Sequence, residues 1–397
     1  MNEKSRAFLQ RALSKEEKII SWRRDFHKHP ELGFEENRTS SIIAEALEQM
    51  GYEVSGGIGI TGVVATLTGE REGPSRALRA DMDALPMKEE TGLPYASVHH
   101  GIMHACCHDG HMAMLLGAAE IIAECRQDLR GKIALVFQPG EEGFAGAKKM
   151  LEEGFLEKYP LDFMFGHHIM PVILPHKSLT TRKNAFTANS DRFYIDIQGR
   201  GGHASIPHLV KDPIPALGQM IGAINSLVSR NIDPFEEVVV SIGQVHAGSS
   251  ENIIPDSALV TGSVRTFTDL SQELVHKRLE EICEGIGQAY GLGTSFEYRY
   301  NYRSVMNDPD LTGQLIELGL EFCDDVIERE HPFTGSEDFS FFSREIPSCF
   351  VMIGAEGTEG VHNPKMTFDE SILSWGAAWQ AYLAIRSGDE WFKNFRG

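Results

Sequence analysis

The sequence predicts an α/β fold: a large domain with helices on both faces of a mixed sheet, and a small domain inserted into it. In the first half of the chain, helical and strand patterns alternate, which is typical of such sheets. Near residue 187 the order changes to β-α-β-β-α-β, which is that of a ferredoxin-like domain. A length of 397 residues also exceeds one typical domain. We therefore predict a discontinuous large domain over residues 1–186 and 302–397, and an inserted domain over residues 187–301.

The individual elements follow from the spacing of apolar residues. The first segment contains predicted helices over 17–28, 40–50 and 110–125, and predicted strands over 63–67, 77–79, 133–137 and 163–165. The inserted segment contains strands over 192–197, 237–245, 258–266 and 294–300, and helices over 213–228 and 269–290. The last segment returns to α/β character with an apolar strand over 349–353. In open α/β sheets, sites gather where strands end and loops begin.

Composition and charge limit the class of protein. The chain is 42% hydrophobic and 24% charged, which is ordinary for a globular protein. Its net charge of −20 and the absence of a basic run make nucleic acid or an anionic membrane surface an unexpected partner. The first 20 residues lack the apolar core of a signal peptide, and no apolar stretch approaches the roughly 18 residues of a membrane span. Six scattered cysteines form no disulfide framework, so we expect a cytoplasmic protein.

The run MHACCHDGH at residues 103–111 concentrates thiols and imidazoles, which bind transition metals well; zinc favours both. Cys106 and His108 stand two positions apart, so both can reach one metal ion in an extended or turning segment. The helical pattern that follows predicts a ligand loop ahead of a buried helix, which Asp109 could cap. The alternative is a His-rich surface turn beside a buried pair of thiols.

Two adjacent carboxylates, Glu141 and Glu142, follow the apolar strand predicted at 133–137. One can bind a metal ion while the other faces a metal-activated water and takes its proton as a general base. The alternative is a solvated turn, which is common. The place at a strand end and the Cys/His run upstream favour the catalytic interpretation.

Histidines follow two further predicted strands. Either His167 or His168 could be a ligand after the strand at 163–165, and His362 follows the strand at 349–353 and a Gly-rich loop. A single histidine in such a place is more often a satisfied core residue. Together with the thiols and carboxylates, however, these side chains gather metal ligands at several strand ends, as an active site at a sheet edge requires.

Weaker signals come from five other residues. Asp81 and Asp83 follow the strand at 77–79 and could orient an imidazole ligand, with an Asx turn as the alternative. In the inserted domain, His203 lies in a Gly-rich turn and could stabilise an oxyanion, although an exposed hairpin histidine is the commoner interpretation. Asn252 is equally open, and Arg265 could bind a substrate carboxylate or be a surface charge on a strand.

The motifs together resemble a known family, the metal-dependent aminoacylases and carboxypeptidases. Seven of them occur in the family's order: MHACCHDGH, QPGEEG, GHHIMP, GRGGHAS, ENIIPD, GSEDFS and HNP. The segments RRDFHKHPELGFEE and ALRADMDALP resemble it too, so the likeness runs from about Arg23 to the last helix. The branch that the chain most resembles contains hippurate hydrolases, auxin-conjugate hydrolases and N-acyl-amino-acid amidohydrolases.

This resemblance implies a catalytic domain with two divalent metal ions per subunit, zinc, manganese, cobalt or nickel, and an inserted lid domain that often dimerises. Cys106 resembles the ligand that bridges the metals, and the other ligands by motif are His108, Glu142, His168 and His362. Glu141 resembles the general base, and His203 resembles the lid imidazole that assists the oxyanion, in some members across a dimer. The residues that resemble the pocket for the substrate's carboxylate are Asn252, Arg265, Gly335 and Ser336.

The implied reaction is hydrolysis of an N-acyl amino acid to a carboxylic acid and a free amino acid. A dipeptidase or carboxypeptidase activity is the alternative within the family. Two positions depart from its pattern: Cys107 replaces a glycine between the Cys and His ligands, and His167 replaces an apolar residue. We prefer His168 as the ligand because it keeps the family's spacing to Pro171.

Two more distant alternatives belong to other classes of protein. One is a thiol hydrolase that uses Cys106 or Cys107 as its nucleophile. The other is a binding protein that keeps the fold without activity. The retained pair of Glu141 and Glu142 argues against the second, because binding alone does not require a base.

Overall fold

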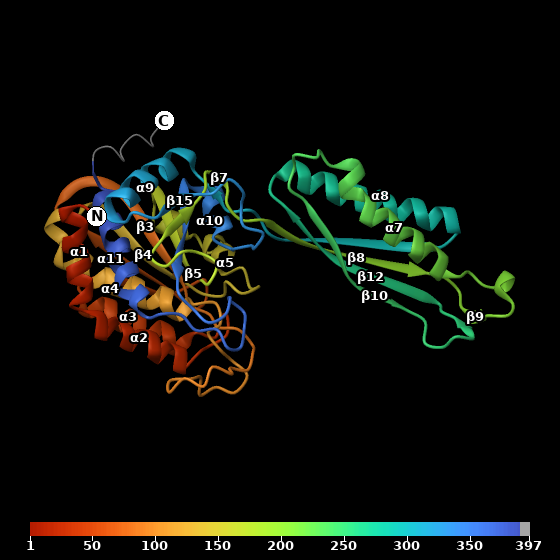
Figure 1. Cartoon of the computed structure of the whole chain (residues 1–397), viewed down its shortest axis with the longest axis horizontal. Helices are drawn as coiled ribbons and strands as arrows, with labels where there is room; N and C mark the ends of the chain where they lie inside the picture. Colours follow the sequence, from red (N-terminus) through yellow and green to blue (C-terminus); the bar gives the residue numbers. More distant parts are fainter. Residues whose placement is uncertain (390–397) are drawn as a thin grey trace. The chain divides into compact units, whose positions relative to one another are not determined.

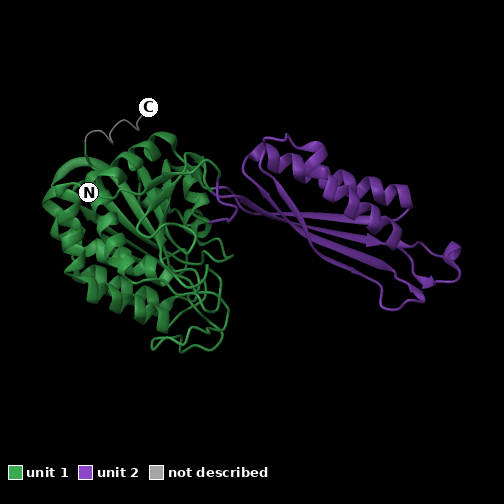
Figure 2. Cartoon of the chain, in the orientation of Figure 1, with its two compact units in different colours: residues 1–186, 305–331, 338–397 green, residues 187–304, 332–337 purple. Residues whose placement is uncertain are grey.

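The computed structural model describes residues 1–389, whose contacts divide into two units (Figures 1 and 2). The first unit holds residues 1–186, 305–331 and the chain from 338 onward; the second holds residues 187–304 and 332–337. Each unit has its own buried apolar core. The domain boundaries predicted at 186/187 and 301/302, and the catalytic and lid roles expected of the two domains, stay predictions.

The first unit is built on a mixed sheet with the strand order β1-β2-β4-β3-β5-β16-β6-β15. Its centre, β4-β3-β5-β16, is parallel, and the pairs β1–β2, β2–β4 and β16–β6 are antiparallel. The strands are β1 (Glu53–Ile58), β2 (Gly62–Thr68), β3 (Arg71–Asp81), β4 (Arg130–Gln138), β5 (Phe163–Pro171), β6 (Leu179–Thr181), β15 (Val326–Glu328) and β16 (Ser348–Ala355). Because the four central strands are parallel, the residues at their carboxyl ends meet at one edge.

Helices cover both faces of this sheet. On β16, Val351 joins the core that also contains residues of α4 and α11, whereas Phe350 packs against Phe339 with ring centroids 5.1 Å apart. Neighbouring residues of a strand point to opposite faces, so the chain leading into α10 lies on the face opposite α4 and α11. The helices are α1 (Glu3–Leu13), α2 (Glu16–Lys28), α3 (Asn37–Gln49), α4 (His108–Glu124), α5 (Gly146–Glu152), α6 (Phe155–Lys158), α9 (Pro309–Phe322), α10 (Ser340–Glu345) and α11 (Ser371–Arg386).

The apolar character of α4 and α11 explains their place in the core. Both are apolar on nearly every side, as helices packed between a sheet and other helices must be. They approach so closely that a Cβ atom on Gly376 would lie 2.1 Å from Met114 Sδ. None of the described helices combines the length and the apolar character needed to cross a membrane.

The second unit is a four-stranded antiparallel sheet with the order β10-β12-β8-β13 and two helices. Its elements are β8 (Asn189–Gln198), α7 (Pro213–Asn231), β10 (Val239–Ala247), β12 (Ser257–Thr266), α8 (Asp269–Tyr290) and β13 (Gly293–Tyr302). Along the chain they follow the predicted β-α-β-β-α-β order. Short pairs complete the fold: β9 (Gly202–His203) with β11 (Ile253–Ile254), and, in the first unit, β7 (Asn184–Ala185) with β14 (Met306–Asn307).

Two local predictions were wrong. The strand expected at 163–165 continues to Pro171, so His167 and His168 lie inside β5 rather than after it. Asp109 does not cap α4, because the helix begins at His108 and Asp109 lies in its first turn. The Asp109 carboxylate is instead held by two buried basic side chains of α2: Arg23 Nε lies 2.8 Å from Oδ2, and His27 Nδ1 lies at the same distance.

Candidate functional site

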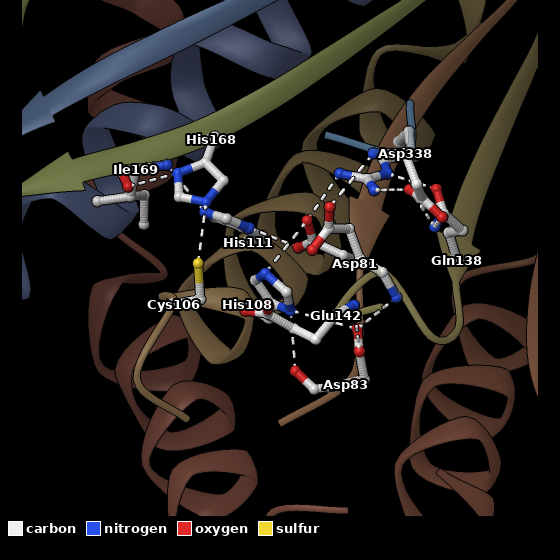
Figure 3. Close-up of polar contacts among 12 residues, drawn as sticks. Asp81, Asp83, Cys106, His108, His111, Gln138, Glu142, His168, Ile169 and Asp338 are labelled. Atoms are coloured by element: carbon white, nitrogen blue, oxygen red, sulfur yellow. Dashed lines mark hydrogen bonds and ion pairs between the residues drawn. The ribbon is translucent and has the colours of Figure 1, made fainter. Parts of the chain in front are cut away.

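Cys106, in the loop that precedes α4, and His108, the first residue of that helix, lie at the carboxyl edge of the parallel strands (Figure 3). Cys106 and His108 are both buried. His108 Nδ1 donates a hydrogen bond to the carbonyl of Asp83 at 2.8 Å. The other ring nitrogen, Nε2, is buried and makes no hydrogen bond within residues 1–389, although Asp81 Oδ2 lies 3.5 Å from it. A buried nitrogen without a hydrogen bond is costly, which makes it a candidate metal ligand.

His168 meets this loop from β5. Its Nδ1 donates to the carbonyl of Ile169 at 2.7 Å, and its Nε2 lies 3.4 Å from Cys106 Sγ. The possible ligand atoms of Cys106, His108 and His168 all lie within 4.8 Å of one another. The alternation of β5 points His167 to the other face, where its Nε2 accepts a hydrogen bond from Trp379 Nε1 at 3.1 Å. His168 is therefore the histidine that joins the cluster, and His167 is a core residue.

Cys106 also belongs to a second group. Its partners are Glu142, from the turn after β4, and His362, from the loop after β16, and again the three ligand atoms lie within 4.8 Å. His362 Nε2 is 3.3 Å from Cys106 Sγ and 3.1 Å from Glu142 Oε1. The two groups thus share one sulfur atom, which is the arrangement that a ligand bridging two metal ions requires.

The donor set fits divalent metal ions. It combines thiol, imidazole and carboxylate groups, which zinc and neighbouring divalent transition metals accept. Burial and the nearby carboxylates of Glu142 and Glu141 raise the pKa of the Cys106 thiol well above its usual range. A thiolate at this position therefore requires positive charge beside it, which bound cations would supply.

Glu141 lies next to the second group and is buried with 6% of its surface exposed. Its Oε1 accepts a hydrogen bond from the amide of Asp338 at 3.2 Å. With His108 and Glu142 it forms a further group of ligand atoms within 4.8 Å. The carboxylate is thus held beside the cluster, where it can face a water molecule held there.

Asp81 and Asp83, expected to orient ligands, lie beside the cluster and hold different groups. Asp83 accepts hydrogen bonds from His108 through its carbonyl and from the amides of Glu141 and Glu142 through its carboxylate, at 2.9 and 2.8 Å. The Asp81 carboxylate contacts His111 Nδ1 at 2.5 Å. Burial opposes its ionisation, but the charges of His108 and Arg79 hold the pKa of Asp81 well below its usual range.

Sequence reasoning missed His111, although it lies in the same MHACCHDGH run. Its Nε2 accepts a hydrogen bond from the amide of Ile169 at 2.8 Å, so its Nδ1 carries the proton and donates to Asp81. This bond fixes the backbone directly after His168. The three-residue spacing of His108 and His111 along one face of α4 was the signal that could have revealed it.

A second missed group lies behind Glu141. The carboxylate of Asp338, from the GSEDFS motif, accepts hydrogen bonds from Arg79 at 3.0 Å and Gln138 at 2.8 Å, and from the amide of Ala147 at 3.0 Å. Arg79 also donates to Asp81 at 2.7 Å. These residues lie in motifs noted in the sequence, but nothing there indicated that they meet.

A third missed residue is Glu36, in the segment HKHPELGFEE. Its carboxylate is fully buried and accepts hydrogen bonds from the Thr61 hydroxyl at 2.5 Å and the amide of Gly140 at 2.8 Å. Burial is the largest cause of a rise in the pKa of Glu36 to about 7, and the nearby charge of Asp83 adds to it.

The remaining predicted residues, His203, Asn252, Arg265, Gly335 and Ser336, belong to the second unit. The β9–β11 ribbon brings two of them together, because the amide of Ala204, next to His203, donates to the carbonyl of Asn252 at 3.1 Å. His203 is exposed, and its Nδ1 accepts a hydrogen bond from the amide of Ser205 at 3.1 Å. Arg265 is partly buried on β12. Their roles toward a substrate stay predictions.

Comparison with known proteins places this geometry in a family. Residues 77–386 match the model of peptidase family M20/M25/M40. The chain belongs to this family. It is 40% identical to an N-acetylcysteine deacetylase of Bacillus subtilis (strain 168), over 93% of this chain and 96% of that protein. It is also 40% identical to the hippurate hydrolase of Campylobacter jejuni, over 92% of this chain and 95% of that protein.

A solved structure supports both the family membership and the fold. A Bacillus subtilis protein described as a dinuclear metal binding peptidase of the M20 family superposes with a TM-score of 0.83. It is 36% identical in sequence, and the superposition covers 94% of this chain and 99% of that one. The predicted family and the α/β fold class are therefore confirmed.

Cys107, the departure from the M20-type pattern, has a conformation that explains the usual glycine. Its φ is +65°, in the left-handed region that glycine adopts most easily. Its thiol turns into the apolar core, where Sγ lies 3.9 Å from Met366 Sδ. The side chain of Cys107 thus points away from the two donor groups.

We predict that Cys106→Ala loses most of its bound metal and that Cys107→Gly keeps it. The first change removes the sulfur that both donor groups share, whereas the second leaves every candidate ligand in place. Metal analysis of the two purified variants measures the difference. Equal loss in both would show that the two thiols are not separated in this way.

Glu36→Gln should change how stability depends on pH. Glutamate titrates near pH 4.3 in an unfolded chain, whereas burial raises the pKa of Glu36 to about 7. Between these values the folded protein binds the extra proton, so this group makes stability fall as the pH rises. The variant should gain up to about 3 kcal/mol relative to wild type between pH 5 and pH 8. Urea unfolding of chelator-treated proteins measures this gain, and the same difference at both pH values would contradict it.

Proposed function

We propose that this protein is a metal-dependent amidohydrolase that cleaves N-acyl amino acids to a carboxylic acid and a free amino acid. The observation that carries the proposal is the pair of donor groups that share Cys106, with the Glu141 carboxylate held beside them. The names of two relatives, each 40% identical over more than nine-tenths of this chain, support the substrate class.

The residues fit two divalent metal ions, for which we propose zinc, manganese, cobalt or nickel. Cys106, His108 and His168 would hold one, and Cys106, Glu142 and His362 would hold the other. Bound there, the metals would lower the pKa of a water molecule and polarise the substrate's carbonyl group. The chemistry that remains is proton transfer and orientation, which the side chains of the chain itself supply.

Glu141 is the proposed general base. Its carboxylate takes a proton from the attacking water as the new C–O bond forms, and delivers it to the amine nitrogen as the C–N bond breaks. The amide of Asp338 donates to Oε1 of this carboxylate at 3.2 Å and so helps to orient it. In the same proposal, His203 donates to the developing oxyanion, and Asn252, Arg265, Gly335 and Ser336 bind the substrate's carboxylate.

The proposal extends to assembly and location. We propose a homodimer formed through the second unit, so that His203 of one subunit can serve the other. All six cysteines are free and buried, which supports a reducing compartment such as the cytoplasm.

The experiment that tests the function is a hydrolysis screen with each of the four metals. Its arms are N-acetyl and N-benzoyl amino acids, longer acyl amino acids and dipeptides. Release of a free amino acid that stops with chelator and returns with metal supports the proposal. Activity that survives the chelator but stops with a thiol alkylating agent would favour a cysteine nucleophile instead. Cleavage of dipeptides alone would favour the peptidase alternative.

Glu141→Gln should abolish turnover while the metal content stays near that of wild type. The variant keeps the shape of the side chain but cannot take a proton from water. Loss of a general base costs a factor of about 10² to 10⁴. Initial rates and metal analysis on the same preparation measure both quantities. A rate within about tenfold of wild type would remove Glu141 from this role.

His203→Ala should lower kcat strongly and leave bound metal unchanged. Within residues 1–389, the donor groups do not include His203, and Glu337 is their one member in the second unit. An oxyanion donor lowers the activation barrier by about 3 to 4 kcal/mol in comparable sites. Mixing His203→Ala with Glu141→Gln subunits tests the route, since recovered activity shows that the imidazole acts across a dimer. An unchanged kcat in His203→Ala alone would refute the oxyanion role.

A further inference from the structure

The turn after β4 carries both Glu141 and Glu142, and three successive amides of this turn donate to buried carboxylates. The amides of Glu141 and Glu142 donate to Asp83. The amide of Gly140, just before them, donates to Glu36 Oε1 at 2.8 Å. Glu36 comes from a segment more than 100 residues earlier in the chain. The turn is therefore fixed at its first residue by a group outside the sheet.

Glu36 stands at the N-cap position of α3, but it does not cap this helix. Its side chain makes no hydrogen bond to the helix amides. Those amides are satisfied by Glu31, whose two carboxylate oxygens accept from Arg38 at 3.0 Å and Thr39 at 2.8 Å. Because Glu31 accepts the hydrogen bonds that an N-cap side chain normally accepts, the Glu36 carboxylate can reach Gly140 instead.

The Glu36 carboxylate is itself held in one orientation. Thr61, in the turn between β1 and β2, donates its hydroxyl to Oε2 at 2.5 Å, and this leaves Oε1 for Gly140. Burial raises the pKa of this group, so the ionised form costs folding free energy. Because the ionised Glu36 side chain lowers the folding stability, its hydrogen bond to the turn after β4 explains its presence better than a stabilising role does.

The backbone conformation of Gly140 makes its hydrogen bond to Glu36 important for the direction of the turn. Its φ is +57°, and a Cβ there would lie 3.1 Å from both Phe144 and Phe34, so the residue turns the chain in a tight space. A rotation at this position would redirect the two side chains that follow. Misplacement of a reacting group by about 1 Å can cost two orders of magnitude in rate.

We propose that Glu36 is a positioning residue for Glu141 and Glu142: by holding the Gly140 amide, it sets the direction in which both carboxylates leave the turn. The inference rests on the proposed hydrolase function for its kinetic part. It also has a consequence that is independent of catalysis, because Glu142 belongs to one of the two donor groups that share Cys106. Residues that orient metal ligands typically change metal affinity by about 10- to 100-fold when they are lost.

The test compares Glu36→Ala, Glu36→Gln and the control Glu35→Ala in the full-length protein. Glu35 is the exposed neighbour of Glu36. Two quantities are measured: kcat and KM on the best substrate of the screen, and the affinity of the metal-free protein for Co²⁺ by visible absorption. We expect Glu36→Ala to lose about 10- to 100-fold in kcat with little change in KM, and to bind one Co²⁺ equivalent about tenfold more weakly. Glu36→Gln, which keeps an acceptor for Gly140, should recover most of both losses.

Glu35→Ala should match wild type in both measurements. If Glu36→Ala matches it as well, the positioning role is overturned. If Glu36→Ala does not fold, the isosteric change Thr61→Val replaces it in the test, because it removes the hydroxyl that orients Glu36. Thr61→Val should show smaller losses in kcat and in Co²⁺ affinity. If both quantities equal those of wild type, the positioning role is overturned. If wild type hydrolyses no substrate, the proposed function fails, and the Co²⁺ affinities still decide the role of Glu36.

Discussion

The first unit depends on one constraint: the carboxylates gathered at the carboxyl edge of its parallel strands must be compensated where water does not reach them. An ionised carboxylate loses its hydration on burial and is stable only beside cations or hydrogen-bond donors. Arg79 meets this need for Asp81 and Asp338, with both ion pairs fully buried. Two backbone amides meet it for Asp83, whereas one amide and the Thr61 hydroxyl meet it only in part for Glu36, whose pKa burial still raises. Each of these bonds also fixes a piece of backbone, so compensation of charge and placement of the donor groups are the same set of contacts.

Arg79 shows how far this coupling extends. Its partners Asp81 and Asp338 are separated in the chain by the whole of the second unit. Asp338 in turn presents its backbone amide to Glu141 while its side chain accepts from Gln138, at the end of the strand that leads to Glu141. One guanidinium group therefore ties the strand ends and the returning chain into a single arrangement. Its loss would remove a counter-ion from two buried carboxylates, which typically costs several kcal/mol.

Much of this unit could be predicted from the sequence, because periodic apolar patterns are local signals. The helix α4 and the central strands, like α8 in the second unit, were found from their apolar patterns, with errors of up to six residues at their ends. Cys106 and His108 were found because a short run that holds both thiols and imidazoles is unusual outside metal sites. The other candidate ligands, Glu142, His168 and His362, were assigned by the family resemblance. The choice between His167 and His168 rested on family spacing, whereas the structure gives a physical reason, since the two residues point to opposite faces of β5.

The partners of the ligands could not be predicted in the same way. Glu36 resembles any acidic residue ahead of a helix, and only the folded chain shows that Glu31 caps α3 in its place. Asp109 had the residue type and position of a cap, but its carboxylate contacts the buried Arg23 and His27 side chains of α2 instead. Cys107 could be identified as a departure from a glycine, yet only the folded chain shows its positive φ and the contact of its thiol with Met366. The contacts of Glu36 with Gly140, of Asp109 with α2 and of Cys107 with Met366 all join residues distant in sequence, so no local pattern records them.

The location of both donor groups in the first unit has a consequence for the evolution of specificity. Every member of the two groups that share Cys106 lies in the first unit, as do the side chains found to orient them. The residues proposed to recognise the substrate's carboxylate and oxyanion lie in the second. The second unit has a separate apolar core, so its surface can change without disturbing the charge balance of the first. A family built in this way can keep one set of donor groups while its members differ in the amide that they accept.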